Sequence, residues 1–175
     1  CFTYVHPIET LVEKNFRKKV FYFPISEKLI YDNKKLQELY ALEEILMTGY
    51  PFGLWDEENN FPIFRKGITA SHPAYNFNGE ENIGLVDIPI FGGNSGSPIY
   101  IYNETGYSDK KGNRYLGKRI IFLGVIYQEY SFNINGEVET IEIPKENITH
   151  KVRIDVGRYI KANEILKFRE MLPKF

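Results

Sequence analysis

The segment with the clearest chemical potential reads F-G-G-N-S-G-S-P over residues 91–98. A serine between glycines can expose its hydroxyl on a tight turn, and small neighbours let a substrate carbonyl approach closely. Backbone N–H groups in such a turn can point at the negative oxygen that develops during acyl transfer. Ser95 is therefore the candidate nucleophile. The alternative is an ordinary glycine-rich loop between two strands, because glycine clusters are common in turns.

Two other glycine motifs do not fit this segment. A nucleophile elbow, G-x-S-x-G, would require glycine where Ser97 stands, and it leads into a helix, whereas a strand is expected here. No G-x-x-x-x-G-K-[ST] occurs in the chain, which excludes a phosphate-binding loop of that type. Acyl transfer is the chemistry that the segment favours.

Composition narrows the remaining classes. The 175 residues suffice for one domain, and 22 Lys+Arg against 23 Asp+Glu give a net charge of −1, which argues against a nucleic-acid partner. The single Cys1 and three separated histidines predict neither a disulfide nor a metal site. The chain has no apolar stretch long enough to predict a membrane span, and its first residues lack the basic-then-apolar order of a signal peptide. The compartment stays open, with a cytoplasmic location favoured.

The elements expected around this segment are strands. Residues rich in β-formers lie between turn residues near 44–50, 62–70, 83–89, 97–102, 119–130 and 151–160. They predict an all-β fold, a six-stranded antiparallel Greek-key barrel. Asn135-Gly136 is expected to close a hairpin between residues 127–132 and 137–143. Residues 161–172 carry apolar side chains at helical spacing and predict a C-terminal α-helix.

Residues 1–40 have a different pattern from residues 41–175, which hold the barrel and the terminal helix. Residues 1–5 could form one strand, and residues 34–43 carry charges at helix-like spacing. We expect one or two strands in this segment and no second barrel.

Four stretches, in the same order, resemble the trypsin-like (chymotrypsin-fold) serine peptidases. Residues 86–98 are similar to the nucleophile segment of the bacterial form, G-N-S-G-[SG]-P, with Asp87 eight residues before Ser95. The others are G-Y-P-F-G at 49–53, R-K-G-I-T-A at 65–70 and L-G-V-I-Y at 123–127. The likeness covers residues 41–172, the C-terminal half of that fold.

The resemblance implies a role for each matching residue. Ser95 would be the nucleophile, and the backbone N–H groups of Gly93 and Ser95 would form the oxyanion hole. The backbone of Tyr127, Gln128 and Glu129 would pair with an extended polypeptide substrate. No metal or organic cofactor is implied.

Two departures bear on activation and specificity. Asn94 replaces the aspartate that captures a freed N-terminal amine in animal digestive enzymes, so activation by N-terminal cleavage is not expected. Pro89 stands where enzymes that cut after Arg or Lys have an aspartate. Because Tyr127 and Tyr130 flank Glu129, the pocket between residues 89–92, 125–129 and 153–157 is expected to be mostly apolar.

The general base is the largest departure. The family order is His, Asp, Ser, but His72 and His150 do not fit it, and residues 1–7, with His6, resemble the strand that follows the catalytic aspartate. On this alignment the base and its orienting carboxylate lie upstream of Cys1, and residues 1–40 are the remnant of the N-terminal barrel with the connection between the two barrels. A barrel without that partner is expected to expose an apolar strip, partly covered by residues 1–40, and to self-associate.

The sequence therefore predicts a fragment of a serine endopeptidase that acts through an acyl-enzyme on Ser95 and is inactive alone. The alternative is a catalytically inactive peptide-binding module with the same fold.

Overall fold

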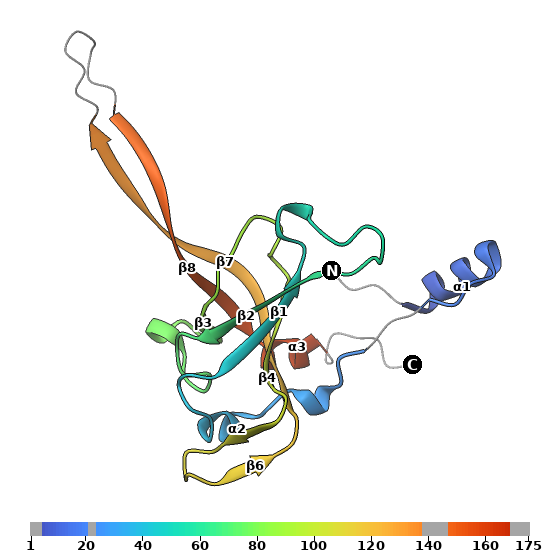
Figure 1. Ribbon diagram of the computed structural model, residues 1–175, viewed down its shortest axis with the longest axis horizontal. Coiled ribbons are helices and arrows are strands. Elements are labelled where there is room, and N and C mark those ends of the chain that lie inside the picture. Colours follow the sequence, from blue (N-terminus) through green and yellow to red (C-terminus); the bar gives the residue numbers. More distant parts are fainter. Residues whose placement is uncertain (1–4, 21–23, 138–146, 169–175) are drawn as a thin grey trace.

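The computed structural model describes residues 5–20, 24–137 and 147–168, which form a barrel with a long two-stranded arm (Figure 1). Six strands close the barrel in the order β1-β2-β3-β8-β7-β4, and all neighbours are antiparallel. They are β1 (Glu44–Gly49), β2 (Ile63–Thr69), β3 (Ile83–Asp87), β4 (Pro98–Asn103), β7 (Arg119–Glu137) and β8 (Asn147–Lys161). This confirms the predicted six-stranded antiparallel barrel.

The connection from β3 to β4 carries the candidate nucleophile. β1, β2 and β3 pair in sequence, and β4 returns to the other side of β1, which is the Greek-key arrangement. Since β3 lies between β2 and β8 whereas β4 lies between β1 and β7, the chain must cross one end of the barrel between them. Residues 88–97 make this crossing.

The core is built from the inward-facing residues of the strands, because successive side chains of a strand point to opposite faces. In β1 the exposed Glu44 is followed by alternating buried and half-buried residues. The residues that are almost completely buried include Ile45, Met47, Val86, Ile99, Ile101, Ile121, Ile126 and Tyr159.

A buried ion pair lies near a small hairpin formed by β5 (Gly106–Ser108) and β6 (Arg114–Leu116). Arg119 donates to Glu43 at 2.5 Å, and both side chains are only 6% exposed. Arg119 also donates to the Asn103 amide oxygen at 2.8 Å. This pair joins the segment before β1 to the first residue of β7.

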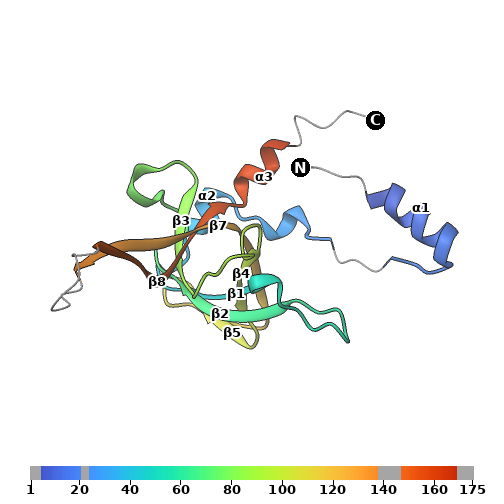
Figure 2. The same cartoon turned by 90° about the horizontal axis from the view of Figure 1, so that it is seen from above.

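The N-terminal segment corrects one expectation. Its described residues form helices, α1 (Val5–Phe16), the 3-10 helix η1 (Glu27–Leu29) and α2 (Asn33–Gln37), and no strand. The likeness of residues 1–7 to a strand is therefore wrong from Val5 onward, while residues 1–4 lie outside the described part. The physical reason is that Val5, Ile8 and Val12 repeat at helical spacing. Figure 2 shows α1 standing apart from the barrel.

The arm corrects a second expectation. Asn135 and Gly136 belong to β7 and pair with Thr149 and Ile148 of β8, so they do not form the hairpin turn. The pairing of β7 with β8 begins in the barrel, with Gly124 opposite Lys161, and continues past these two residues. The connection between the two strands falls in residues 138–146, outside the described residues, as does most of the strand expected over 137–143.

The C-terminal helix α3 (Asn163–Lys167) begins later than expected, because Lys161 still belongs to β8 and its N–H donates to the carbonyl of Asn82 at 2.9 Å. The rest of the expected helix, after Phe168, lies outside the described residues. Among the helices that are described, none has the length and apolar character needed to cross a membrane.

Candidate active site

Ser95 lies on an exposed turn that is fixed to β7 by backbone hydrogen bonds. The N–H of Gly96 donates to the carbonyl of Ile126 at 2.7 Å, and the N–H of Ile126 donates to the carbonyl of Ser97 at 2.9 Å. Within the turn, the N–H of Ser97 donates to the carbonyl of Asn94 at 2.9 Å. The turn therefore has a defined shape before any ligand binds.

The backbone N–H groups of Gly93 and Ser95 are available at this turn. Neither donates a hydrogen bond to another described residue, whereas the intervening Asn94 N–H donates to the carbonyl of Phe91 at 3.0 Å. Gly93 and Ser95 line the same cavity of about 370 Å³, together with residues 48–50, Pro62 and residues 96–98. Two free N–H groups beside an exposed serine hydroxyl are the donor arrangement that an oxyanion hole requires.

Gly93 can hold this conformation because it has no side chain. Its φ is +92°, a region that L-residues rarely adopt, and a Cβ there would lie 2.5 Å from the carbonyl oxygen of Tyr50. The 3-10 helix η2 (Pro51–Gly53) supports the same loop, since the N–H of Phe52 donates to the carbonyl of Gly92 at 2.6 Å. The turn is thus held by η2 on one side and by β7 on the other.

The side chains on either side of Ser95 point inward. Asn94 is fully buried, its Nδ2 lies 4.0 Å from the sulfur of Met47, and its Oδ1 accepts no hydrogen bond from a described residue. Ser97 is also buried, and a Cβ on Gly49 would lie 2.1 Å from its Oγ. The alternation of buried and exposed residues presents Ser95 to the surface.

The expected substrate-binding residues Tyr127, Gln128 and Glu129 follow directly after the attachment of the turn to β7. β4 pairs with β7 only as far as Val125, whereas β8 continues on the opposite side, with Gln128 opposite Arg158. The register with β8 shifts between Ile126 and Gln128. On the β4 side, Ile126 bonds to the turn, and no described strand pairs with β7 beyond it.

Two of the three walls expected for the primary pocket, residues 89–92 and 153–157, contact each other. Ile90 is buried against Gly157 of β8, where an added Cβ would lie 2.6 Å from Ile90 Cγ1. Arg65 donates from Nη1 to the carbonyl of Pro89 at 2.5 Å, and its guanidinium lies 4.9 Å from the ring centroid of Phe91. An aliphatic side chain therefore occupies the space between the two walls.

Neither His6 nor His72, the two histidines whose side chains are described, lines the cavity beside Ser95. The Nδ1 of His72 accepts from the N–H of Ala74 at 3.1 Å, and its Nε2 lies 2.8 Å from Lys110 Nζ. Partial burial and then the Lys110 charge hold the pKa of His72 below its usual value. His6 lies on α1, and the backbone of His150 lies on the arm, opposite Ile134.

The cavity beside Ser95 has no carboxylate, imidazole or amine side chain among its described lining residues. Nor do the described residues bring three His, Cys, Asp or Glu side chains together in a group that could hold a metal ion. Among the described residues, the site thus brings together an exposed serine and two available N–H groups with no carboxylate or imidazole in the cavity lining.

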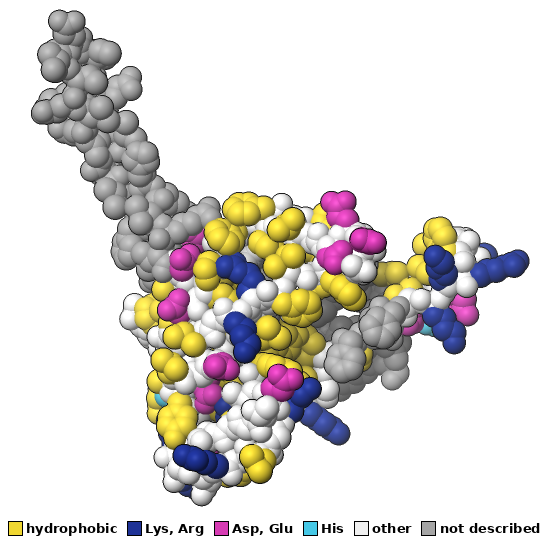
Figure 3. All heavy atoms as spheres, in the orientation of Figure 1, with side chains coloured by type: hydrophobic (Ala, Val, Ile, Leu, Met, Phe, Trp, Pro, Cys, Tyr) yellow, Lys and Arg dark blue, Asp and Glu magenta, His cyan; other side chains and the backbone are white. Residues whose placement is uncertain are grey.

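Two grooves adjoin this site. The apolar groove, of about 520 Å³, includes Gly96 and Pro98, and its other lining residues are Ile25, Glu27, Ile30, Phe122, Val125, Ile165, Leu166 and Phe168. The aromatic groove, of about 490 Å³, is lined by residues 51–55, Glu57 and Phe91. In Figure 3, hydrophobic side chains gather over this second region, with acidic ones at its outer end.

The sequence reasoning missed the aromatic groove. The available signal was the density of large apolar residues between the first two strands, at Tyr50, Phe52, Leu54, Trp55 and Phe61, which exceeds what a solvated loop needs.

Comparison of the chain with family models, curated proteins and solved structures found no match.

Proposed function

We propose that this chain is the nucleophile-bearing barrel of a trypsin-like serine endopeptidase. The observation that carries the proposal is the pair of available N–H groups on Gly93 and Ser95, which line one cavity beside the exposed Ser95 hydroxyl. The inward-facing Asn94 and Ser97 support it, since they fix which residues of the turn face the cavity.

In the proposed reaction, Ser95 Oγ bonds to the substrate carbonyl carbon while its proton passes to a base. The carbonyl electron pair moves onto oxygen, and the N–H groups of Gly93 and Ser95 stabilise that charge. The C–N bond then breaks as the leaving amine takes the proton, which leaves an ester on Ser95. Water hydrolyses this ester and regenerates the hydroxyl.

The base in this proposal comes from polypeptide outside the 175 residues. The apolar groove is the surface on which an N-terminal barrel would dock, since its lining is mostly apolar and includes Gly96 and Pro98 beside the nucleophile. A partner on this groove would reach the cavity of Ser95, which has Gly96 and Pro98 in common with the groove. The proposed partner would thus cover the apolar groove and supply the general base.

The second candidate function is peptide binding without catalysis. It is favoured by the lack of a carboxylate, imidazole or amine among the described residues that line the cavity. An extended peptide would still add to β7 beyond Ile126, whatever the state of Ser95.

A peptide boronate separates the two candidates. Boron accepts a serine oxygen to become tetrahedral, with the hydroxyl proton released to water, so its adduct reports nucleophile and oxyanion donors together. We expect acetyl-Ala-Ala-Pro-boroVal to give a tetrahedral ¹¹B resonance with this chain and to lose it with Ser95→Ala. Ser108→Ala, which removes a hydroxyl from β5, is the matched control.

The outcomes discriminate clearly. An unchanged tetrahedral signal in Ser95→Ala, or no adduct with the unaltered chain, would contradict the peptidase proposal. Binding of the corresponding boron-free peptide with equal affinity to all three proteins, without any adduct, would support the binding module instead.

A further inference from the structure

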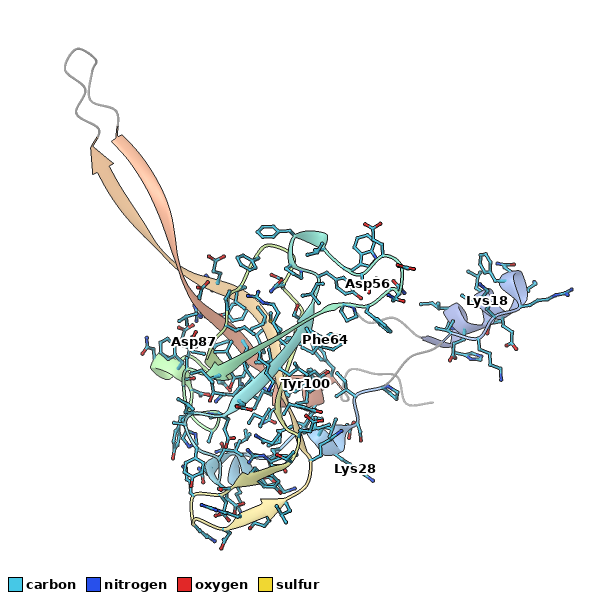
Figure 4. All side chains as sticks on the ribbon, viewed as in Figure 1. Lys18, Lys28, Asp56, Phe64, Asp87 and Tyr100 are labelled. Carbon is cyan, nitrogen blue, oxygen red and sulfur yellow. The ribbon has the colours of Figure 1, made fainter. Side chains whose placement is uncertain are left out.

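The aromatic groove is a preformed feature of the loop between η2 and β2. The rings of Phe52 and Phe91 lie 5.2 Å apart, and Asp56 and Phe61 exchange backbone hydrogen bonds of 2.9 and 3.2 Å that close the loop. Asp56 also accepts from the backbone N–H of Asn59 at 3.0 Å. Figure 4 shows Asp56 at the outer end of this loop. The groove thus has both walls in place.

Its floor is unusually exposed for large apolar side chains. Phe52, Leu54 and Trp55 are 72%, 61% and 41% exposed. The groove lies next to the turn of Ser95, because the backbone N–H of Phe52 donates to the carbonyl of Gly92. Such a concentration of accessible apolar side chains marks a contact surface.

The loop of the groove carries only acidic charges, and one cation, Arg65, lies beside it. Residues 50–64 contain Asp56, Glu57 and Glu58 and no lysine or arginine, and Glu57 itself lines the groove. Arg65 already places its guanidinium 4.9 Å from the centroid of Phe91, so a ring of the groove is in contact with a cation. Aromatic faces attract guanidinium groups, and a nearby carboxylate adds to that attraction.

We propose that the aromatic groove binds an arginine side chain of a polypeptide, with the aliphatic stem on Phe52 and Trp55 and the guanidinium directed to Glu57. Arginine fits better than lysine because its planar guanidinium can bind a carboxylate such as Glu57 through two hydrogen bonds.

The position of the groove assigns this arginine to one side of the cleaved bond, an assignment that rests on the proposed function. The turn of Ser95 is attached to β7 through Gly96 and to η2 through Gly92. If the acyl part of the substrate pairs with β7 beyond Ile126, the leaving part extends toward η2 and the groove. The enzyme would then favour bonds with an arginine shortly after the point of cleavage.

Trp55 gives a direct test, since it is the only tryptophan in the chain and lines the groove. Its emission is followed during titration with acetyl-Ala-Arg-Ala-amide and with the uncharged citrulline peptide. We expect a saturable change with the arginine peptide and roughly 3- to 10-fold weaker binding of the citrulline peptide. Glu57→Gln is expected to abolish that difference.

Glu58→Gln is the matched control, because Glu58 does not belong to the lining and its loss removes the same charge. Ser95→Ala is expected to bind the arginine peptide as the unaltered chain does, which separates this test from the boronate test of the proposed function. Equal binding of the two peptides, equal effects of Glu57→Gln and Glu58→Gln, or no response of Trp55 would overturn the proposal. A Trp55 signal that changes with protein concentration alone would assign the groove to a second copy and would also overturn it.

Discussion

Adding one methyl group at Gly93 should disrupt the candidate oxyanion hole more than the same change at either neighbouring glycine. At Gly93, with φ +92°, a Cβ would lie 2.5 Å from the Tyr50 carbonyl oxygen and 3.2 Å from the Phe52 nitrogen. These are backbone atoms, which cannot rotate away, so the loop itself must move. The Gly93 N–H then leaves the position in which it would meet the oxyanion.

Two alanine variants serve as controls. Gly96 has φ +86° but no atom within 4 Å of an added Cβ, so Gly96→Ala carries backbone strain alone, about 1–3 kcal/mol. Gly92→Ala has neither strain nor a contact closer than the ring of Phe52 at 4.0 Å, and we expect little change. Gly93→Ala combines strain with overpacking, which adds about 1–3 kcal/mol.

Urea unfolding followed by circular dichroism measures stability, and ¹¹B titration with the peptide boronate measures the adduct. Loss of one oxyanion donor typically costs roughly 100- to 1,000-fold in rate, and we expect a loss of about 100-fold in the affinity of the tetrahedral adduct for Gly93→Ala. Gly96→Ala should keep most of that affinity. If the two variants weakened stability and adduct equally, contact with residues 50–52 would not be what positions the donor.

Three further outcomes are expected. Glu43→Ala, which leaves the buried Arg119 without its carboxylate, should lower the free energy of unfolding by about 3–5 kcal/mol, whereas the exposed Glu44→Gln should change it by less than about 1 kcal/mol in the same urea titration. The pKa of His72 is lowered in the folded chain, so the unfolded chain binds more protons between the two pKa values. Stability should therefore fall as pH drops through and below about 6.5, where an unperturbed histidine titrates. Thermal unfolding at pH 7.5 and 5.5 should show a smaller fall for His72→Gln. With Ile90 buried between the pocket walls, a boronate with a valine side chain should bind more tightly in ¹¹B titrations than one with an arginine side chain.

The barrel could be predicted from the sequence because each strand carries its own signal. Alternation in β1 and the continuous apolar run that starts β7 are local properties, and turn residues bound them. The prediction of a turn at Asn135-Gly136 was wrong for the opposite reason. Its local preference is overridden by a ladder whose register is set in the barrel, more than ten residues away, where Gly124 pairs with Lys161.

The candidate site was predicted in part for a similar reason. Glycine, serine and asparagine at residues 92–97 indicate a tight turn, so Ser95 and its neighbours could be named from sequence. What holds the turn could not be named, because Phe52 and Ile126 bond to it from distant parts of the chain. The aromatic groove was missed because a sequence does not tell which large apolar side chains other residues will cover.

The attachment of the turn at both ends separates two contributions to the proposed reaction. Gly96 is bonded to β7 and Gly92 to η2, so the donors at Gly93 and Ser95 are fixed before a substrate arrives and do not depend on a base. Removing the base from such a triad costs on the order of a million-fold in turnover, while oxyanion donors alone keep roughly 1,000-fold over water. This chain should therefore bond a boronate through Ser95 yet hydrolyse an ordinary peptide at no more than a small residual rate. Robust hydrolysis by these 175 residues, lost with Ser95→Ala, would show that a base within the chain reaches the serine and that the assignment of the base to a partner is wrong.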